Sequence, residues 1–146
     1  MGADQTVVYI TREQLQFITN HARSTYPEEC CGFLLGTDSE HRIIGRALSV
    51  QNANQGSRKN RFNIDPMELV RADEEARRAN LNVIGIYHSH PDAPPQPSRV
   101  DLENAWPWYT YLVVSVQNGE PKGVAAWTLS RDRSTFHLED MRVMDD

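Results

Sequence analysis

The chain has 146 residues and a mass of 16.7 kDa, with 39% hydrophobic and 24% charged residues. This size and composition are typical of one globular domain, so we expect residues 1–146 to form a single domain. The 15 basic and 20 acidic residues give a net charge of -5. Because phosphate backbones attract a surplus of basic residues, this balance excludes non-specific nucleic-acid binding.

Hydropathy and cysteine content exclude two further classes. The mean hydropathy is -0.60, and no apolar run approaches the roughly 20 residues of a membrane-spanning helix. The N-terminus carries Asp4 where a signal peptide carries basic residues, so we expect a cytoplasmic protein. Cys30 and Cys31 are adjacent, and a disulfide between neighbours would close a strained ring. We interpret them as small buried residues entering a strand, a redox pair being the less favoured alternative.

Two helices are marked by the residues at their N-termini. Thr11 and Gln14 form the pattern of a capping box, and the helix that begins there stops before Pro27. Asp65, followed directly by proline, predicts a second helix that runs to about Asn80.

Short apolar runs between these helices predict the strands of a mixed sheet. Two segments lack any periodicity and are interpreted as loops, the Asn-rich residues 51–63 and the proline-rich residues 91–97. We expect both loops to wall a substrate site, ordinary surface loops being the alternative. The expected strands are residues 31–36, 42–50, 81–87, 109–116, 123–129 and 135–138.

His88 and His90 follow the strand expected at 81–87. Because side chains alternate along a strand, both imidazoles point to the same side and make half of a zinc site. Asp101, in the first turn of a short helix expected from Ser98, can supply a third ligand and leave a fourth position for water, as catalytic zinc sites do. The alternative is that Ser98 and Asp101 serve only as a helix cap.

A hydrolytic metal site also needs a general base. Glu28 and Glu29 stand where the first helix gives way to a strand. On this segment alone, a pair of solvated acids is favoured over a catalytic role.

An aromatic group follows the metal motif, made of Trp106, Trp108 and Tyr109. Large aromatic side chains dominate cores and interfaces alike. For these three residues, packing in the core is favoured over contact with a substrate.

These residues together resemble the signature of the JAMM metalloproteases, also called MPN+ domains. That signature is Glu-x-Cys-Gly, then His-Ser/Thr-His, and after seven residues Ser-x-x-Asp. Every position is matched, and the likeness extends from about residue 11 to residue 138, which we take as the core of the domain. The matching residues are Glu29-Cys30-Cys31-Gly32, His88-Ser89-His90, Ser98 and Asp101.

The resemblance implies an α/β (α+β) fold similar to that of cytidine deaminases, with a curved, mixed β-sheet flanked by helices. It also implies one zinc ion per chain, with His88, His90 and Asp101 as its ligands. It selects Glu29 as the acid and base of catalysis, and it implies that Ser98 hydrogen-bonds the oxyanion of the tetrahedral intermediate.

The family hydrolyses peptide or isopeptide bonds after the C-terminal Gly-Gly of ubiquitin and ubiquitin-like proteins. This short chain is similar to the small, free-standing bacterial members, which implies a ubiquitin-like sulfur-carrier protein as substrate. The intact motif argues against a non-catalytic scaffold of the same family. A zinc deaminase is excluded because His-x-Glu and Pro-Cys-x-x-Cys are absent, and the RadC-like group usually carries an N-terminal helical module for which no residues remain.

Overall fold

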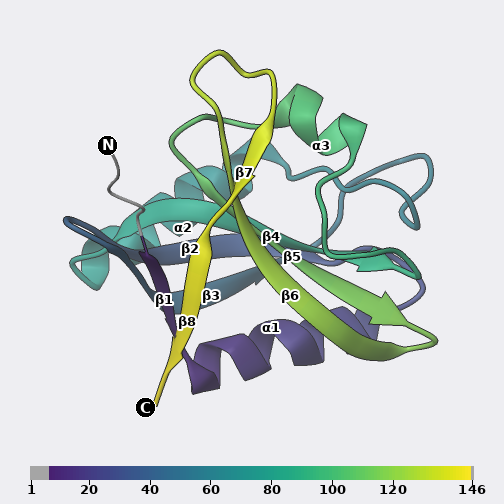
Figure 1. The fold of residues 1–146 in the computed structure, drawn as a ribbon, viewed down its shortest axis with the longest axis horizontal. Helices are drawn as coiled ribbons and strands as arrows, with labels where there is room; N and C mark the ends of the chain where they lie inside the picture. Colours follow the sequence, from purple (N-terminus) through teal and green to yellow (C-terminus); the bar gives the residue numbers. More distant parts are fainter. Residues whose placement is uncertain (1–6, 146) are drawn as a thin grey trace.

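The computed structural model describes residues 7–145. The segment 1–6, on which the expectation of a missing signal peptide depends, lies outside the described residues. The helices are α1 (Arg12–Thr25), α2 (Pro66–Arg78) and α3 (Arg99–Asn104). The strands, drawn in Figure 1, are β1 (Val7–Thr11), β2 (Cys31–Asp38), β3 (Arg42–Val50), β4 (Asn82–Pro91), β5 (Thr110–Gln117), β6 (Glu120–Leu129), β7 (Phe136–Leu138) and β8 (Asp140–Met144).

The strands form one eight-stranded sheet in the order β7-β6-β5-β4-β2-β3-β1-β8. The pairs β4–β5, β1–β3 and β1–β8 are parallel, and the other pairs are antiparallel. β7 and β8 follow each other in the chain but stand at opposite ends of the sheet order, so this segment joins the two edges (Figure 1). The sheet is therefore curved and nearly closed, which confirms the mixed, curved sheet that the sequence predicts.

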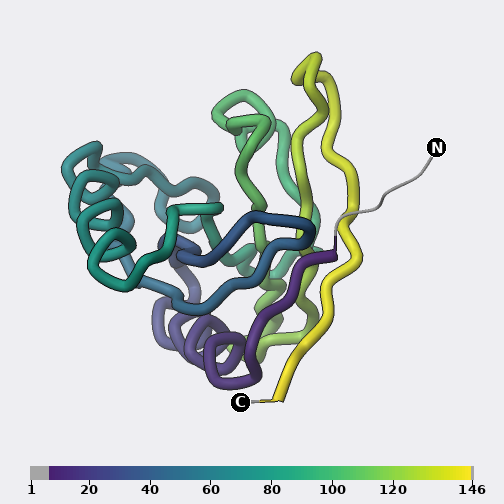
Figure 2. Tube along the Cα trace, turned by 90° about the vertical axis from the view of Figure 1, so that its left-hand side faces the viewer, coloured from purple at the N-terminus to yellow at the C-terminus, as the bar shows by residue number. Residues whose placement is uncertain are grey.

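The two long helices cover opposite faces of this sheet. Ile18 and Ala22 of α1 pack in one buried cluster with Leu34 of β2, whereas Ala72 of α2 packs in another with Phe33. Neighbouring residues of a strand point to opposite faces, so β2 lies between two cores. Figure 2 shows β2 and β3 (blue) passing between α1 (purple) and α2 (teal).

Both long helices begin where the sequence predicts. Thr11 Oγ1 accepts a hydrogen bond from Gln14 N at 3.3 Å, and Asp65 Oδ1 accepts one from Met67 N at 2.9 Å. Only the Thr11 half of the predicted capping box is formed. The side chain of Gln14 does not complete it, because Gln14 Oε1 accepts from Ala47 N at 2.8 Å. Gln14 thereby ties α1 to β3.

The structure extends the sheet beyond the predicted strands. β4 continues past residue 87 to Pro91 because β5 pairs along it, with His88 opposite Val113 and His90 opposite Ser115. The sequence pattern predicts neither β1 nor β8. β8 is partly exposed along its whole length, so it shows little apolar periodicity, and its parallel pairing with β1 is a long-range contact that no local pattern reveals.

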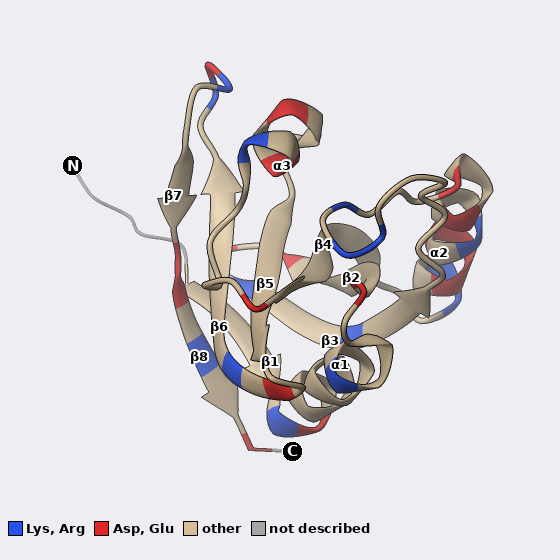
Figure 3. Cartoon of the chain, turned by 90° about the vertical axis from the view of Figure 1, so that its right-hand side faces the viewer, with Lys and Arg blue, Asp and Glu red and all other residues tan. Residues whose placement is uncertain are grey.

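Charges of both signs are interspersed on the surface. Along α2, Arg71 pairs with Glu68 at 3.0 Å and Arg77 pairs with Asp73 at 3.6 Å, and the two colours alternate along this helix in Figure 3. Within residues 7–145, no helix is long and apolar enough to cross a membrane.

Gly32 lies on β2 where the ring of Tyr87 crosses from β4. A Cβ atom at Gly32 would lie 2.2 Å from both Leu48 O and Tyr87 Cε2. Tyr87 is fully buried, and its hydroxyl lies 2.7 Å from His21 Nδ1 on α1, so the ring is held in place. The glycine of the Glu-x-Cys-Gly motif is thus required by packing.

Replacing Gly32 by Ala is expected to lower the free energy of unfolding by about 1–3 kcal/mol, because the added methyl overpacks the contact with Tyr87. Urea denaturation measures this loss. Gly45→Ala in β3 is the control, since its Cβ would lie 3.8 Å from the nearest atom, Leu81 Cδ1. Equal stability of the two variants would contradict the packing argument.

Candidate metal centre

The site lies where β2 and β4 pair at one end of the sheet. Their antiparallel register sets Cys31 opposite His88, so Glu29, two residues earlier, falls opposite His90. Alternation places the three side chains Glu29, His88 and His90 on the same face of the sheet. One ligand atom from each of these three side chains lies within 4.8 Å of the other two, which makes them a group able to hold a metal ion.

Asp101 reaches the same point from α3. Its Oδ2 lies 3.1 Å from His88 Nε2 and 3.1 Å from His90 Nε2, and the two Nε2 atoms are 3.2 Å apart. Ligand atoms at about 2.0–2.1 Å from a tetrahedral ion are roughly 3.3 Å from one another. The three atoms are therefore spaced as the ligands of a single ion are.

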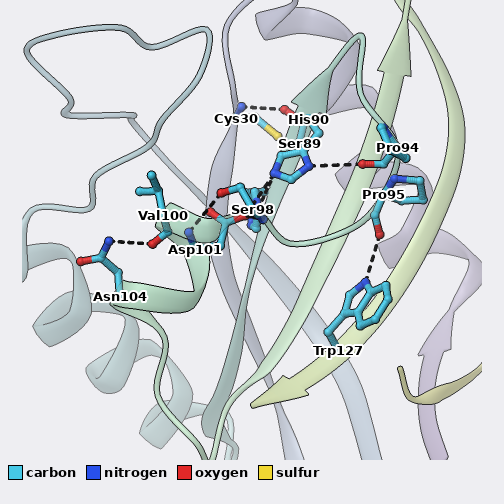
Figure 4. A network of polar contacts seen from close by, with 11 residues as sticks. Cys30, Ser89, His90, Pro94, Pro95, Ser98, Val100, Asp101, Asn104 and Trp127 are labelled. Carbon is cyan, nitrogen blue, oxygen red and sulfur yellow. Dashed lines mark hydrogen bonds and ion pairs between the residues drawn. The ribbon is translucent and has the colours of Figure 1, made fainter. Parts of the chain in front are cut away.

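The proline-rich loop orients His90. Its Nδ1–H donates to Pro94 O at 3.2 Å (Figure 4), which turns Nε2 toward Asp101. Trp127 Nε1–H of β6 donates to Pro95 O at 3.0 Å, so the loop itself is anchored to the sheet.

On the side of the ring away from Asp101, His88 is held by stacking and not by a hydrogen bond. Its ring centroid lies 4.7 Å from that of Phe62, with an angle of 26° between the planes. His88 Nδ1 is buried and has no hydrogen-bond partner among the described residues. Phe62, in the Asn-rich loop, therefore orients the ring of His88, as the hydrogen bond to Pro94 O orients the ring of His90.

Glu29 is only 4% exposed. Its Oε1 has no hydrogen-bond partner among residues 7–145, although buried polar atoms normally have one. Burial, which penalises the charged form, raises the pKa of Glu29 to about 8. Glu28 instead forms an ion pair with Arg58 at 3.2 Å near the surface. The expectation of two solvated acids is therefore correct for Glu28 and wrong for Glu29.

The Asn-rich loop holds the backbone of Glu29. Glu29 N–H donates to Arg58 O at 2.7 Å, and Asn52 Nδ2 donates to Glu29 O at 3.1 Å. Both loops line one cleft of about 330 Å³ beside Glu29, so they lie where the walls of a substrate site were predicted, and the binding of a substrate there stays a prediction. The lining of the cleft includes Lys59 and Asn60 from the first loop, and Pro94 and Gln96 from the second, together with Ser98.

Ser98 and Asp101 form a complete capping box at α3. Ser98 Oγ accepts from Asp101 N at 3.1 Å, and Asp101 Oδ2 accepts from Ser98 N at 2.7 Å. Ser98 and Asp101 thus cap α3. Asp101 also faces the two histidines, and Ser98 also lines the cleft. Burial raises the pKa of Asp101, but the electrostatic attraction of His88 and the hydrogen bonds with His88, His90 and Ser98 N outweigh it and hold this pKa below its ordinary value.

Ser89, between the two histidines, points to the opposite face and fastens β4 to the start of β2. Its Oγ accepts from Cys30 N at 2.8 Å (Figure 4), and its N–H donates to Cys30 O at 3.2 Å. Cys30 and Cys31 are free and buried, which confirms their interpretation as buried residues. Because Cys30 directly follows Glu29 in the chain, this pair of hydrogen bonds also fixes the position of Glu29 just before β2.

The aromatic group after α3 departs from expectation. Trp106 is 49% exposed and Trp108 is 60% exposed, so the prediction that they pack in the core is wrong. Tyr109 does pack on a buried cluster that contains Tyr111 and Leu129. The tryptophans lie in the turn between α3 and β5, where no periodicity tells an inward side chain from an outward one.

Residues 11–130 match the family Prok-JAB, described as prokaryotic homologs of the JAB domain. The chain therefore belongs to this family, which confirms the resemblance found in the sequence. It is 40% identical over 102 residues to a desampylase of Pyrococcus furiosus, covering 70% of this chain and 67% of that protein. It is 30% identical over 140 residues to a CysO-cysteine peptidase of Mycobacterium tuberculosis, covering 95% and 84%.

Solved structures support the same fold. The solution structure of a Desulfitobacterium hafniense protein superposes with a TM-score of 0.83 at 28% identity, covering 95% of this chain and 94% of that one. The crystal structure of a JAB1/MPN domain protein from Archaeoglobus fulgidus superposes with a TM-score of 0.60 at 18% identity, covering 93% and 98%. The predicted JAMM/MPN fold is thus confirmed.

Ser89→Ala is expected to lower the free energy of unfolding by about 1–3 kcal/mol, because it leaves the buried Cys30 N–H without an acceptor. Urea denaturation measures the loss. Ser24→Ala is the control, since it removes an exposed serine hydroxyl that is also hydrogen-bonded to the backbone, here by donating to His21 O at 2.8 Å. It should change stability by less than about 0.5 kcal/mol. An equally small effect at Ser89 would remove its fastening role.

Proposed function

We propose that this protein is a zinc metallopeptidase that hydrolyses the amide bond after the C-terminal Gly-Gly of a ubiquitin-like protein, and that its substrate is a sulfur carrier. The observation that carries the proposal is the cluster of His88, His90 and Asp101, whose three facing atoms are 3.1–3.2 Å apart, beside the buried carboxyl of Glu29. Relatives named desampylase and CysO-cysteine peptidase support the class of substrate.

We assign one zinc ion per chain to His88, His90 and Asp101. Two imidazoles and a carboxylate are the donor set of many catalytic zinc sites, and the spacing of the three atoms fits one ion. When bound, zinc supplies Lewis-acid polarisation of the scissile carbonyl and lowers the pKa of water. Glu29 lies close enough to act in the same region, because one of its carboxyl oxygens lies within 4.8 Å of a ring nitrogen of each histidine.

Glu29 carries the proton in this proposal. Its Oε1, which has no other partner in the described chain, accepts a proton from the attacking water as the oxygen adds to the carbonyl carbon. The same carboxyl group then donates that proton to the departing amine as the C–N bond breaks. Because one group takes and returns the proton, no covalent bond to the enzyme is needed.

Ser98 stabilises the oxyanion in this proposal. Its Oγ accepts a hydrogen bond from Asp101 N, and that bond leaves the hydroxyl proton available for donation. Ser98 lines the same cleft as Glu29, where a substrate carbonyl would lie. A donor held in place before the reaction stabilises developing charge without a cost of reorganisation.

We further propose that residues 1–146 work as one domain and that the protein acts in the cytoplasm. Reducing conditions there keep thiols such as those of Cys30 and Cys31 free.

Asp101→Ala is expected to weaken zinc binding by at least about 100-fold, because loss of a ligand costs more than the 10–100-fold typical of outer-shell changes. Titration calorimetry with zinc measures this affinity. Asp101→Asn separates charge from helix capping, since its side-chain oxygen can still accept from Ser98 N. Glu103→Ala, on the same helix, is the control. Full zinc occupancy in both Asp101 variants would remove Asp101 from the ligand set.

The cleavage assay uses a ubiquitin-like sulfur carrier with a short extension after its Gly-Gly, and mass spectrometry identifies the products. We expect cleavage after the second Gly that a chelator abolishes and zinc restores. Glu29→Gln should keep zinc but lose at least about 100-fold in kcat, whereas Glu28→Gln should behave as wild type. Full activity of Glu29→Gln would overturn the role of Glu29, and a protein without metal or cleavage would favour a non-catalytic scaffold.

A further inference from the structure

The carboxyl group of Glu29 lacks the supports that hold other groups of the centre. His90 donates to Pro94 O, and Asp101 accepts from Ser98 N. Glu29 Oε1, in contrast, has no hydrogen-bond partner within the described part of the chain. The place of this carboxyl group therefore depends on the packing around the side chain and on the backbone of residue 29.

The Asn-rich loop holds the backbone of Glu29 on both sides. The N–H of Glu29 donates to Arg58 O at 2.7 Å, and its carbonyl oxygen accepts from Asn52 Nδ2 at 3.1 Å. Glu29 lies just before β2, and both partners belong to the loop rather than to a strand that pairs with β2. The loop therefore sets the position of the backbone that carries the carboxyl group.

Asn52 closes this loop with all the hydrogen bonds that one amide side chain can form. Besides Glu29 O, its Nδ2 donates to Arg61 O at 2.9 Å. Its Oδ1 accepts from Asn54 N and from Asn63 N, both at 3.1 Å. An asparagine amide offers two donor hydrogens and an oxygen with two lone pairs, so these four bonds use its full capacity. The two ends of the loop and the backbone of Glu29 thus meet at one side chain.

Asn52 itself lies outside the region in which the reaction is proposed to occur. It is partly buried, and it lines neither the cleft beside Glu29 nor the neighbouring cavity of about 220 Å³ that His88 and Asp101 line. An effect of Asn52 on the reaction must therefore pass through the residues that it holds.

We propose that Asn52 is the positioning residue of the catalytic base, because its amide group holds the Asn-rich loop closed and thereby fixes the carboxyl group of Glu29 beside the metal ligands. This inference rests on the proposed function, since it takes Glu29 as the group that carries the proton. A displacement of about 1 Å in a reacting group can cost roughly 100-fold in rate. A small shift of the loop would therefore slow the reaction without unfolding the protein.

Two substitutions test the amide group of Asn52. Asn52→Asp keeps an oxygen that accepts the two backbone N–H groups of the loop but loses both N–H donors. Asn52→Ala removes all four bonds without adding a charge. The matched control is Asn54→Asp, a change in the same loop and outside the cleft. Asn54 Nδ2 donates to the side chain of Asn63, whose amide group can rotate and donate in return, whereas the backbone carbonyl of Glu29 cannot.

Both Asn52 variants, at saturating zinc, are expected to cleave the extended carrier with kcat lowered at least about tenfold and KM within about twofold of wild type. Zinc affinity, measured by calorimetry, should change by less than about threefold, because none of the four bonds reaches His88, His90 or Asp101. Asn54→Asp should match wild type in all three quantities. A residue that only stabilised the fold would leave kcat of the folded, zinc-loaded enzyme unchanged.

Amide hydrogen exchange, followed by NMR spectroscopy, tests the same link without a substrate. The N–H of Glu29, which donates to Arg58 O, should lose at least about tenfold in protection in Asn52→Asp. The N–H of Cys30, the next residue, should keep its protection, because its acceptor is Ser89 Oγ of β4.

Three results would overturn the positioning role. They are a wild-type kcat in either folded Asn52 variant, an equal loss of kcat in Asn54→Asp, and unchanged protection of the Glu29 N–H in Asn52→Asp. Cleavage by wild type that the Asn52 variants leave intact would retain the proposed hydrolysis and refute the positioning. Protection of Glu29 that depends on Asn52, in a protein that cleaves no carrier, would refute the hydrolysis and retain the hold of Asn52 on Glu29.

Discussion

The pairing of β2 with β4 is the constraint on which the centre depends. Because Cys31 lies opposite His88, the residue two positions earlier is brought to His90, and Glu29 faces the histidines rather than solvent. A shift of one residue would turn these side chains to the other face of the sheet. Ser89 and Gly32 protect this register, one by bonding Cys30 and the other by leaving room for Tyr87.

Much of the centre could be predicted because its residues obey local rules. The alternation of β4 predicts that His88 and His90 share a face, and the spacing from Ser98 to Asp101 predicts a helix cap. The approach of Asp101 to the histidines could not be derived locally. It depends on the course of the proline-rich loop, which is held by Trp127 of β6, 32 residues beyond its acceptor Pro95. The role of Asp101 as a metal ligand was therefore predicted with the help of the family resemblance and could not be predicted from periodicity alone.

The errors of the sequence analysis have a common physical cause. Burial is decided by tertiary packing, whereas a short segment shows only composition. Glu29 is an acidic residue in a buried position, and Trp106 and Trp108 are apolar residues in exposed positions, so each opposes the average tendency of its type. Such exceptions concentrate at sites of function, because a buried carboxyl and an exposed indole ring both lower the stability of the fold, and packing alone does not explain why they are kept.

The strand that joins the two edges of the sheet has a consequence for the order of folding. β1, near the start of the chain, lies between β3 and β8, and its register with β8 pairs Val7 with Asp140 and Thr11 with Met144. Contacts between residues so distant in sequence form slowly, because a long loop must close first. During synthesis the other strands can pair while the edge of β1 that faces β8 stays unpaired. Completion of the sheet must therefore wait until residues 140–144 have left the ribosome.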